Sequence, residues 1–126
     1  MGFEFPGGRP RVVLSKDVRR IGAAMMKEMA DSLMLSHGLK KDDVRHFVLH
    51  SAGRRVIERA RRLLDLDDSQ VAHSRRVLKR FGNMSSATVL FVLEETLNAG
   101  QPVAGDWGLM IALGPGFAAE GALLRW

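Results

Sequence analysis

Three short clusters in this 126-residue chain combine residue types that could do chemistry. The first is His50 with the Ser51-Ala52-Gly53 that follows it, at the end of a short apolar run where α/β folds tend to bind ligands. The second runs from Gly82 to Thr88 and places the amide of Asn83 and hydroxyls at the start of an apolar helix, whose dipole favours negative charge. The third is Gly114-Pro115-Gly116, where glycine lets the backbone approach another group closely.

Each cluster taken alone also has an ordinary structural explanation. A histidine at the end of a strand is more often a hydrogen-bonded structural residue than a catalyst. Asn83 before Ser85 fits simple turn and capping chemistry, and Gly-Pro-Gly is usually only a turn. The clusters become informative when they are taken together and in this order.

The hydrophobic pattern predicts the strands and helices that would hold these clusters in place. Strands are predicted over 11–15, 45–50, 108–113 and 117–125. Helices are predicted over 17–35, 54–66, 71–81 and 86–97, with Ser85 as the cap of the last one. Strands that alternate with helices and end in a strand pair predict an α/β fold with a mixed sheet.

No internal repeat or linker divides the chain, so residues 1–126 are expected to form a single domain, with 1–10 as a flexible arm. The first helix is predicted to carry one apolar face, made of Val18, Ile21, Met25, Met29 and Leu33. Its methionines are interpreted as core packing. The helix at 86–97 is apolar on all sides and needs several neighbours, which predicts a homo-oligomer or a place within a larger enzyme.

Composition excludes several classes of protein. Hydrophobic residues make up 46% and charged residues 26%, which excludes a collagen, a low-complexity chain and wholesale disorder. The absence of cysteine excludes a disulfide framework, cysteine-ligated zinc and a thiol nucleophile within this chain. His37, His46 and His73 show no metal-ligand spacing, so no metal is expected. No apolar run is long enough to span a membrane, and the first residues hold no signal-peptide core, so we expect a soluble cytoplasmic protein.

The net charge of +5 favours anionic partners, namely nucleic acid, a membrane surface or a phosphorylated cofactor. The basic residues gather in the middle of the chain, and few aromatic residues lie among them. A stacking surface for single-stranded nucleic acid is therefore poorly supported. A small basic nucleic-acid-binding module remains an alternative that rests on charge alone.

The run from Gly82 to Leu93, GNMSSATVLFVL, resembles the asparagine segment of type III polyketide synthases, the chalcone and stilbene synthase family. His50 to Gly53 matches that family's His-Pro-Gly-Gly segment, with Ser51 and Ala52 as departures. Gly114-Pro115-Gly116 matches its Gly-Pro-Gly loop, and Leu14-Ser15-Lys16-Asp17-Val18 is similar to a strand-to-helix junction of the same region. The resemblance covers nearly the whole chain but only the C-terminal half of the family's enzyme.

The resemblance implies an α/β fold that is the C-terminal half of a thiolase-like fold, with a mixed sheet packed with helices. It implies an acyltransferase that condenses malonyl-CoA units onto an acyl-CoA starter, with decarboxylation and cyclisation. Coenzyme A thioesters would be substrates, and no cofactor would be bound permanently. The family's nucleophile is a cysteine of the N-terminal half-domain, which is missing here, so the chain alone is expected to be inactive.

The resemblance also assigns roles to individual residues. His50 and Asn83 would donate hydrogen bonds to the thioester oxygen of malonyl-CoA, and His50 would help to hold the cysteine as a thiolate. The elongation and cyclisation cavity would be lined by Ser85, Gly114, Pro115 and Gly116. Coenzyme A would be bound near Gly53, Arg54 and Arg55. The arginines Arg59, Arg61 and Arg62 are interpreted instead as a solvated helix face, with an ion pair between Glu58 and Arg62.

Two further alternatives concern the kind of enzyme. A ketoacyl-acyl carrier protein synthase III shares the histidine and asparagine donors and an ending similar to Leu124-Arg125-Trp126. The Met84-Ser85-Ser86 that follows Asn83 and the Gly-Pro-Gly favour the polyketide synthase. Within that family the sequence looks bacterial, and an enzyme that makes 3,5-dihydroxyphenylacetyl-CoA is one candidate. Neither nucleic acid nor a membrane is expected as a partner of such an enzyme.

Overall fold

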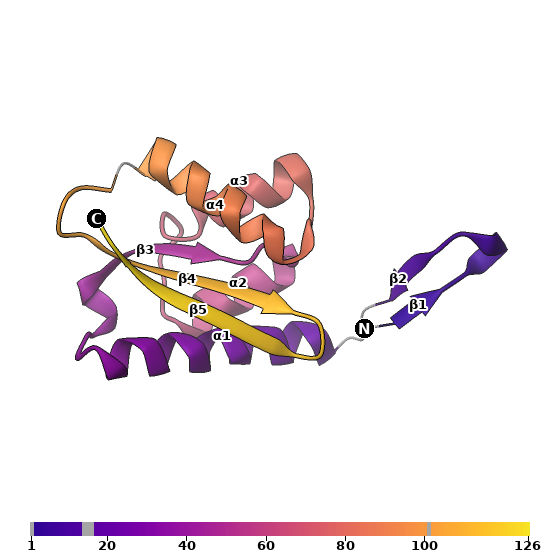
Figure 1. The fold of residues 1–126 in the computed structure, drawn as a ribbon, viewed down its shortest axis with the longest axis horizontal. Helices are drawn as coiled ribbons and strands as arrows, with labels where there is room; N and C mark the ends of the chain where they lie inside the picture. Colours follow the sequence, from indigo (N-terminus) through magenta and orange to yellow (C-terminus); the bar gives the residue numbers. More distant parts are fainter. Residues whose placement is uncertain (1, 14–16, 101) are drawn as a thin grey trace.

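The computed structural model of the chain describes residues 2–13, 17–100 and 102–126. Its elements are β1 (Gly2–Glu4), β2 (Arg11–Val13), α1 (Asp17–Ser36), β3 (Val44–Leu49), α2 (Arg54–Leu63), α3 (Ala72–Phe81), α4 (Thr88–Glu95), β4 (Trp107–Gly114) and β5 (Ala118–Arg125) (Figure 1). Single 3-10 turns occupy Pro6–Gly8, Lys41–Asp43 and Ser85–Ala87, and a π turn occupies Thr96–Gly100. The strands predicted over 45–50, 108–113 and 117–125 are confirmed to within about a residue.

The main sheet has the order β3-β4-β5 and is mixed, as predicted. β3 and β4 run parallel, with Val44 opposite Trp107 and Leu49 opposite Ile111. Parallel strands need a long crossover, and α2, α3 and α4 supply it here. β4 and β5 are antiparallel and are joined by the tight turn after Gly114. As a result, the carboxyl ends of β3 and β4 lie at the same edge of the sheet.

Helices cover both faces of this sheet, so the body has three layers (Figure 1). Alternate side chains of a strand point to opposite faces. Phe47, Leu49, Leu109 and Ile111 belong to the core on the side of α1 and α2, together with Met26, Ala30 and Ile57. Val48 belongs to the second core, with Val77, Val89 and Val92 of α3 and α4. The fold class predicted from the sequence, α/β with helices packed on a mixed sheet, is confirmed.

The apolar face predicted for α1 is displaced from the face that the structure buries. Ala23, Met26 and Ala30 have no exposed surface, whereas Val18, Ile21, Met25, Met29 and Leu33 are only partly buried. Small residues allow close packing, and at Gly121 of β5 a Cβ atom would lie 2.7 Å from both Leu33 Cδ1 and Met29 Cγ. The interpretation of the methionines as core packing is confirmed for Met26, which is completely buried.

The N-terminal residues, for which a flexible arm over 1–10 was predicted, form a hairpin. β1 pairs antiparallel with β2, with Gly2 opposite Val13 and Glu4 opposite Arg11, and the hairpin lies apart from the body (Figure 1). The turn is possible because Gly7 and Gly8 have positive φ values of 61° and 77°. The strand predicted over 11–15 is confirmed for Arg11–Val13. The remainder of that strand, and Leu14 to Lys16 of the junction that resembles the polyketide synthases, lie outside the described residues.

Two helix predictions are wrong at their ends. α2 stops at Leu63 rather than at 66, because Asp65 adopts a φ of 52° and the amide of Leu66 bonds back to the carbonyl of Arg61. The helix predicted over 86–97 is divided, with α4 between a 3-10 turn and a π turn. Ser85 does not cap α4, since it lies within the 3-10 turn with a φ of 61°.

Candidate active site

His50 follows β3 directly, at the carboxyl edge of the sheet, and only 3% of its surface is exposed. Its backbone N–H donates to the carbonyl of Ile111 at 2.9 Å, which extends the pairing of β3 with β4. The backbone N–H of Leu113 donates to its Nδ1 atom at 3.3 Å. Because Nδ1 accepts a hydrogen bond, the proton of the neutral ring sits on Nε2. The pairing of β3 with β4 thus holds the His50 ring in position and fixes its tautomer, in which Nε2 carries the hydrogen.

The surroundings of His50 also keep its imidazole neutral. Burial lowers its pKa below the ordinary value, and a hydrogen bond with the side chain of Asn83 opposes this only in part. A neutral imidazole donates a hydrogen bond without bringing a full positive charge.

We therefore expect the stability of the chain to increase with pH near the ordinary pKa of histidine. Since the folded state lowers the pKa of His50, the unfolded chain binds the proton more readily below about pH 6.5. This contribution is complete above that pH and is lost as the pH falls through the folded pKa. An NMR titration of the His50 ring would check it, and a pKa at or above 6.5 would contradict it. Urea unfolding of His50→Gln is expected to depend less on pH than unfolding of the parent chain.

Asn83 lies just after α3, where Gly82 ends the helix with a φ of 72°. Its Nδ2 donates to the carbonyl of Ala52 at 3.2 Å, and its Oδ1 accepts from the N–H of Ser85 at 2.8 Å. The amide is therefore oriented from both ends, and one of the two Nδ2 hydrogens remains for another acceptor. A hydrogen bond between the side chains of His50 and Asn83, which acts to raise the pKa of the histidine, places these two side chains beside each other.

The third predicted cluster joins the same edge of the sheet. Gly114-Pro115-Gly116 begins where β4 ends, directly after Leu113, whose amide contacts His50. Gly116 needs its positive φ of 74° for this reversal. Ser85 is exposed and contacts Asn83 through its backbone amide. The structure thus brings the first two clusters into contact, and the third begins directly after Leu113, the residue that bonds to His50.

A hollow of about 500 Å³ adjoins the site and is lined by Val18, Arg19, Ala52, Gly53, Arg54, Arg55 and Val56. Ala52 links the hollow to the site, because its carbonyl accepts the hydrogen bond of Asn83. Sequence reasoning placed Arg54 and Arg55 here but missed Arg19. That arginine reaches the hollow only because α1 packs along α2, and no local motif signals it.

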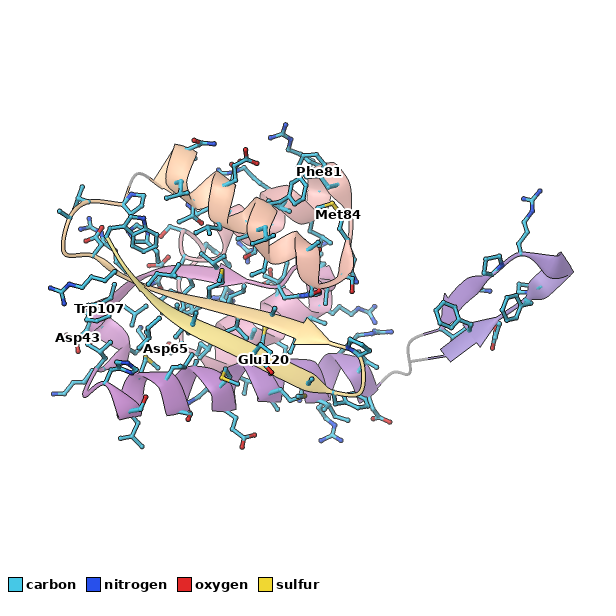
Figure 2. All side chains as sticks on the ribbon, in the orientation of Figure 1. Asp43, Asp65, Phe81, Met84, Trp107 and Glu120 are labelled. Atoms are coloured by element: carbon cyan, nitrogen blue, oxygen red, sulfur yellow. The ribbon has the colours of Figure 1, made fainter. Side chains whose placement is uncertain are left out.

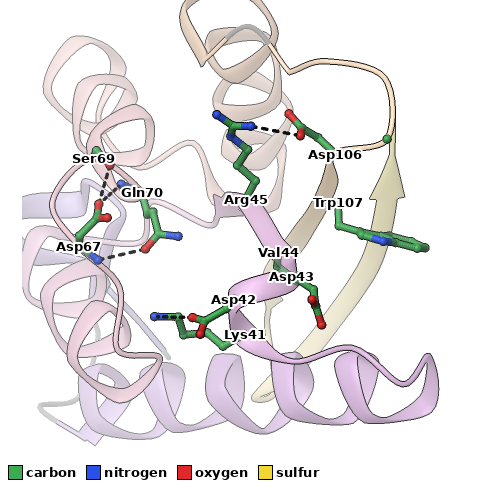
Figure 3. A pocket seen from close by; sticks show the side chains of 11 residues that line it. Lys41, Asp42, Asp43, Val44, Arg45, Asp67, Ser69, Gln70, Asp106 and Trp107 are labelled. Atoms are coloured by element: carbon green, nitrogen blue, oxygen red, sulfur yellow. Dashed lines mark hydrogen bonds and ion pairs between the residues drawn. The ribbon is translucent and has the colours of Figure 1, made fainter.

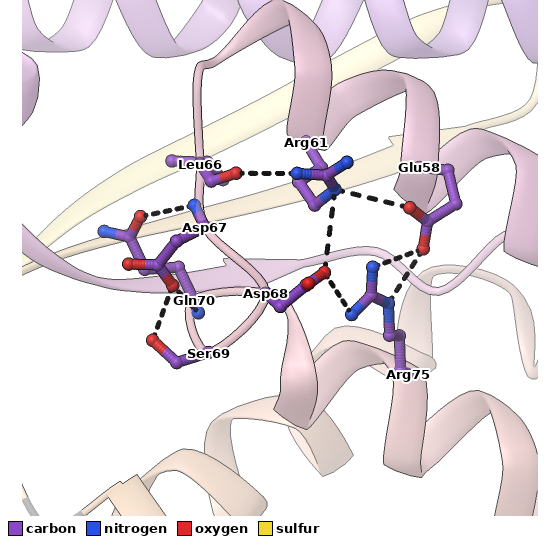
Figure 4. Close-up of polar contacts among 8 residues, drawn as sticks. All are labelled: Glu58, Arg61, Leu66, Asp67, Asp68, Ser69, Gln70 and Arg75. Atoms are coloured by element: carbon purple, nitrogen blue, oxygen red, sulfur yellow. Dashed lines mark hydrogen bonds and ion pairs between the residues drawn. The ribbon is translucent and has the colours of Figure 1, made fainter.

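The charged face of α2 and α3 differs from the prediction. Glu58 bonds to Arg61 at 3.3 Å and to Arg75 at 2.6 Å, not to Arg62 as the spacing suggested (Figure 4). Arg61 also donates to the carbonyl of Leu66, so its interpretation as part of a solvated face is wrong. Arg59 and Arg62 are exposed, as expected.

A second polar cluster lies at the opposite end of the sheet and was missed from the sequence. His46 Nε2 bonds to Asp106 Oδ2 at 2.9 Å, and this bond lowers the pKa of the Asp106 carboxyl. The backbone N–H of Trp126 donates to the carbonyl of Asp106, so the cluster holds the C-terminal residue. Beside it lies a pocket of about 560 Å³ between Lys41, Arg45 and Trp107 (Figure 3). This end of the sheet carries none of the predicted site residues.

Two findings concern other kinds of site. In the described part of the chain, no group of three or more histidine, aspartate or glutamate side chains is arranged to hold a metal ion. No helix among residues 2–13, 17–100 and 102–126 combines the length and apolar character needed to cross a membrane.

The sequence of this chain matches those of known proteins. A family model described as 3-Oxoacyl-[acyl-carrier-protein (ACP)] synthase III C terminal matches residues 34–126. The chain is 34% identical over all its 126 residues to the 1,3,6,8-tetrahydroxynaphthalene synthase of Streptomyces peucetius subsp. caesius, covering 33% of that protein. It is 34% identical over 113 residues to the 3,5-dihydroxyphenylacetyl-CoA synthase of Amycolatopsis balhimycina, covering 90% of the chain and 30% of that protein.

The structure of this chain also matches solved structures of polyketide synthases. The crystal structure of PKS-I from the brown alga Ectocarpus siliculosus superimposes with a TM-score of 0.83 at 33% identity, over 98% of this chain and 34% of that chain. A ketoacyl-acyl carrier protein synthase III, the alternative raised by the Leu124-Arg125-Trp126 ending, is the weaker match. The chain spans about a third of the length of the curated relatives it matches.

The mixed sheet between two helical layers, with a histidine and an asparagine at its carboxyl edge, is a C-terminal part of a thiolase-like fold, about a third of the matched proteins rather than the half that was predicted. The chain belongs to the family of 3-oxoacyl-[acyl-carrier-protein] synthase III C-terminal domains. Within it, the chain corresponds to the C-terminal part of type III polyketide synthases, which confirms the resemblance carried by residues 82–93.

Proposed function

We propose that the chain is the C-terminal part of an acyltransferase that condenses malonyl-CoA units onto an acyl-CoA starter, with decarboxylation and cyclisation. The observation that carries this proposal is the meeting of the His50 and Asn83 side chains at one edge of the sheet, where each is held by its neighbours. Type III polyketide synthases are the relatives that share this fold.

The chemistry explains why two donors are useful. Decarboxylation of a malonyl thioester breaks the bond to the carboxylate carbon and releases carbon dioxide. The electron pair of that bond delocalises onto the thioester oxygen as an enolate. His50 Nε2–H and Asn83 Nδ2–H would stabilise that oxygen, and removal of one such donor typically costs about 100- to 1000-fold in rate.

The nucleophile must come from elsewhere, because the chain contains no cysteine. We propose a cysteine of an N-terminal half-domain, held as a thiolate beside His50. The same half-domain would cover the apolar side chains that α4 leaves exposed, which include Leu90 and Phe91, together with Phe81 of α3 (Figure 2). Without it, we expect the chain to form a homo-oligomer through this surface.

The substrates in this proposal are coenzyme A thioesters, with no permanently bound cofactor. The phosphates of coenzyme A would meet Arg19, Arg54 and Arg55 around the hollow at Gly53. Ser85 and the Gly114-Pro115-Gly116 turn would shape the growing product rather than break or form bonds. We place the reaction in the cytoplasm. A product such as 3,5-dihydroxyphenylacetyl-CoA stays a prediction.

A hybrid enzyme would test the proposal. The last third of the Streptomyces peucetius relative, which this chain matches, is replaced by residues 1–126. We expect the hybrid to release carbon dioxide from malonyl-CoA, whereas the relative with that third deleted releases none. A folded hybrid that binds malonyl-CoA but releases no carbon dioxide would overturn the proposed function.

A further inference from the structure

Two buried serines connect α3 to the residues on either side of His50. Ser51 Oγ donates to the carbonyl of Ser74 at 2.8 Å, and Ser74 Oγ donates to the carbonyl of Leu49 at 3.0 Å. Neither serine has any exposed surface. Buried hydroxyls that are hydrogen-bonded cost little, but they hold their partners in one geometry.

The bond from Ser74 to Leu49 is made at the edge of β3 that pairs with no other strand of the described sheet. The backbone N–H of His50 points to β4, and successive residues of a strand point their polar groups to opposite edges. The carbonyl of Leu49 therefore points away from β4, and β3 is the outer strand on that side. Ser74 supplies a donor there and fixes the strand end just before His50.

α3 connects Ser74, which bonds to the end of β3, to Asn83. Ser74 lies in the first turn of α3, which ends at Phe81 and leads through Gly82 into Asn83. The next residue, Arg75, bonds to Glu58 at 2.6 Å and to Asp68 at 2.9 Å, which ties α3 to α2 and to the α2–α3 connection (Figure 4). One rigid helix thus contacts the neighbours of His50 at one end and leads into Asn83 at the other.

Ser51 occupies the position where the resembling segment has proline. A proline would restrict the backbone covalently and could not donate a hydrogen bond to α3. The hydroxyl of Ser51 provides a restraint of a different kind, and it needs the carbonyl of Ser74 as its partner.

We propose that Ser51 and Ser74 form a two-serine clasp that positions His50 relative to Asn83. Both are positioning residues, since they act through the backbone and contact no reacting atom. The catalytic meaning of the clasp rests on the proposed function, but the geometry it maintains can be measured without any reaction.

The test uses the 126-residue chain with Ser74→Ala and, separately, Ser51→Ala. Amide hydrogen exchange is measured at His50 and Leu113, and the ¹⁵N signals of the His50 ring report its tautomer. We expect exchange at these two amides to become at least about tenfold faster, and the signature of a single Nε2–H tautomer to be lost. If one variant fails to fold, the other still provides the measurement.

Thr96→Val is the matched control. Thr96 is buried, and its hydroxyl donates to the carbonyl of Val92 at 2.8 Å, so this variant loses the same kind of bond far from His50 in the sequence. We expect it to lower the melting temperature by a similar amount and to leave the His50 ring signals unchanged. Equal effects of Ser74→Ala and Thr96→Val at His50 and Leu113, or no effect of the serine variants, would overturn the clasp.

The outcomes separate the clasp from the proposed function. Faster local exchange in the serine variants, combined with a hybrid enzyme that does not decarboxylate malonyl-CoA, would support the clasp and contradict the function. An active hybrid with unchanged exchange in the serine variants would do the reverse. If both proposals hold, Ser74→Ala in the hybrid lowers kcat for decarboxylation about tenfold, while KM for malonyl-CoA stays within about twofold.

Discussion

Replacing Asn83 with alanine in the hybrid enzyme is expected to lower the rate of malonyl-CoA decarboxylation by about 100- to 1000-fold, and His50→Ala by a similar factor. Each change removes one donor to the thioester oxygen at the point where negative charge develops. The structure already holds both donors in place, through the Leu113 amide for His50 and the Ala52 carbonyl for Asn83. Release of labelled carbon dioxide from carboxyl-labelled malonyl-CoA measures the rate.

Ser86→Ala provides the matched control for these variants. Ser86 is exposed and lies in the 3-10 turn that follows Asn83, and no role in the site is assigned to it. We expect its decarboxylation rate to stay within about twofold of the parent hybrid. The donor roles would be wrong if Asn83→Ala or His50→Ala decarboxylated malonyl-CoA as fast as Ser86→Ala.

The second large effect is the inability of the 126-residue chain to carry an acyl group by itself. Acyl transfer of this type needs a thiolate, and the chain has no cysteine. After incubation with malonyl-CoA, mass spectrometry is expected to show the unmodified 13.9 kDa chain. The hybrid enzyme is expected to gain one acyl group and to lose this ability after alkylation of its cysteine. Stable acylation of any side chain of the isolated chain would refute this expectation.

Much of the fold could be predicted because its signals are local. The apolar run of Phe47, Val48 and Leu49 marks β3, and all three side chains are buried. The alternation of strands and helices predicts the parallel pair, since a crossover that contains helices brings β4 beside β3. Gly82 marks the end of α3 correctly, because its positive φ is costly for other residues.

The predictions that failed depend on chain geometry that residue type does not reveal. Asp65 and Ser85 both adopt positive φ values, which are uncommon for residues other than glycine, and so α2 and the helix after Asn83 have unexpected ends. The buried face of α1 uses the small residues Ala23 and Ala30, whereas β5 at Gly121 approaches Met29 and Leu33, which stay partly buried. The pattern of large apolar residues in the sequence therefore predicts the face of α1 next to the one that the structure buries.

The candidate site, like the fold, was only partly predictable from the sequence. Residue type and resemblance identified His50 and Asn83, but their orientation depends on contacts with Leu113 and Ala52 that are distant in the sequence. Ser74 was missed because a serine early in a helix is ordinary, and its value becomes visible only when Leu49 and Ser51 lie beside it.

The central claim, that His50 and Asn83 donate to one thioester oxygen, is tested most directly by infrared spectroscopy. The probe is acetyl-CoA with ¹³C at the carbonyl, bound to the hybrid enzyme after its nucleophilic cysteine has been replaced by alanine. Hydrogen bonds to the oxygen weaken the carbonyl bond. The carbonyl stretch of the bound probe is therefore expected at lower wavenumber than in solution, and it moves back toward the solution value in both His50→Ala and Asn83→Ala. An identical stretch in the parent hybrid and in both variants, with the probe bound in each, would contradict the claim.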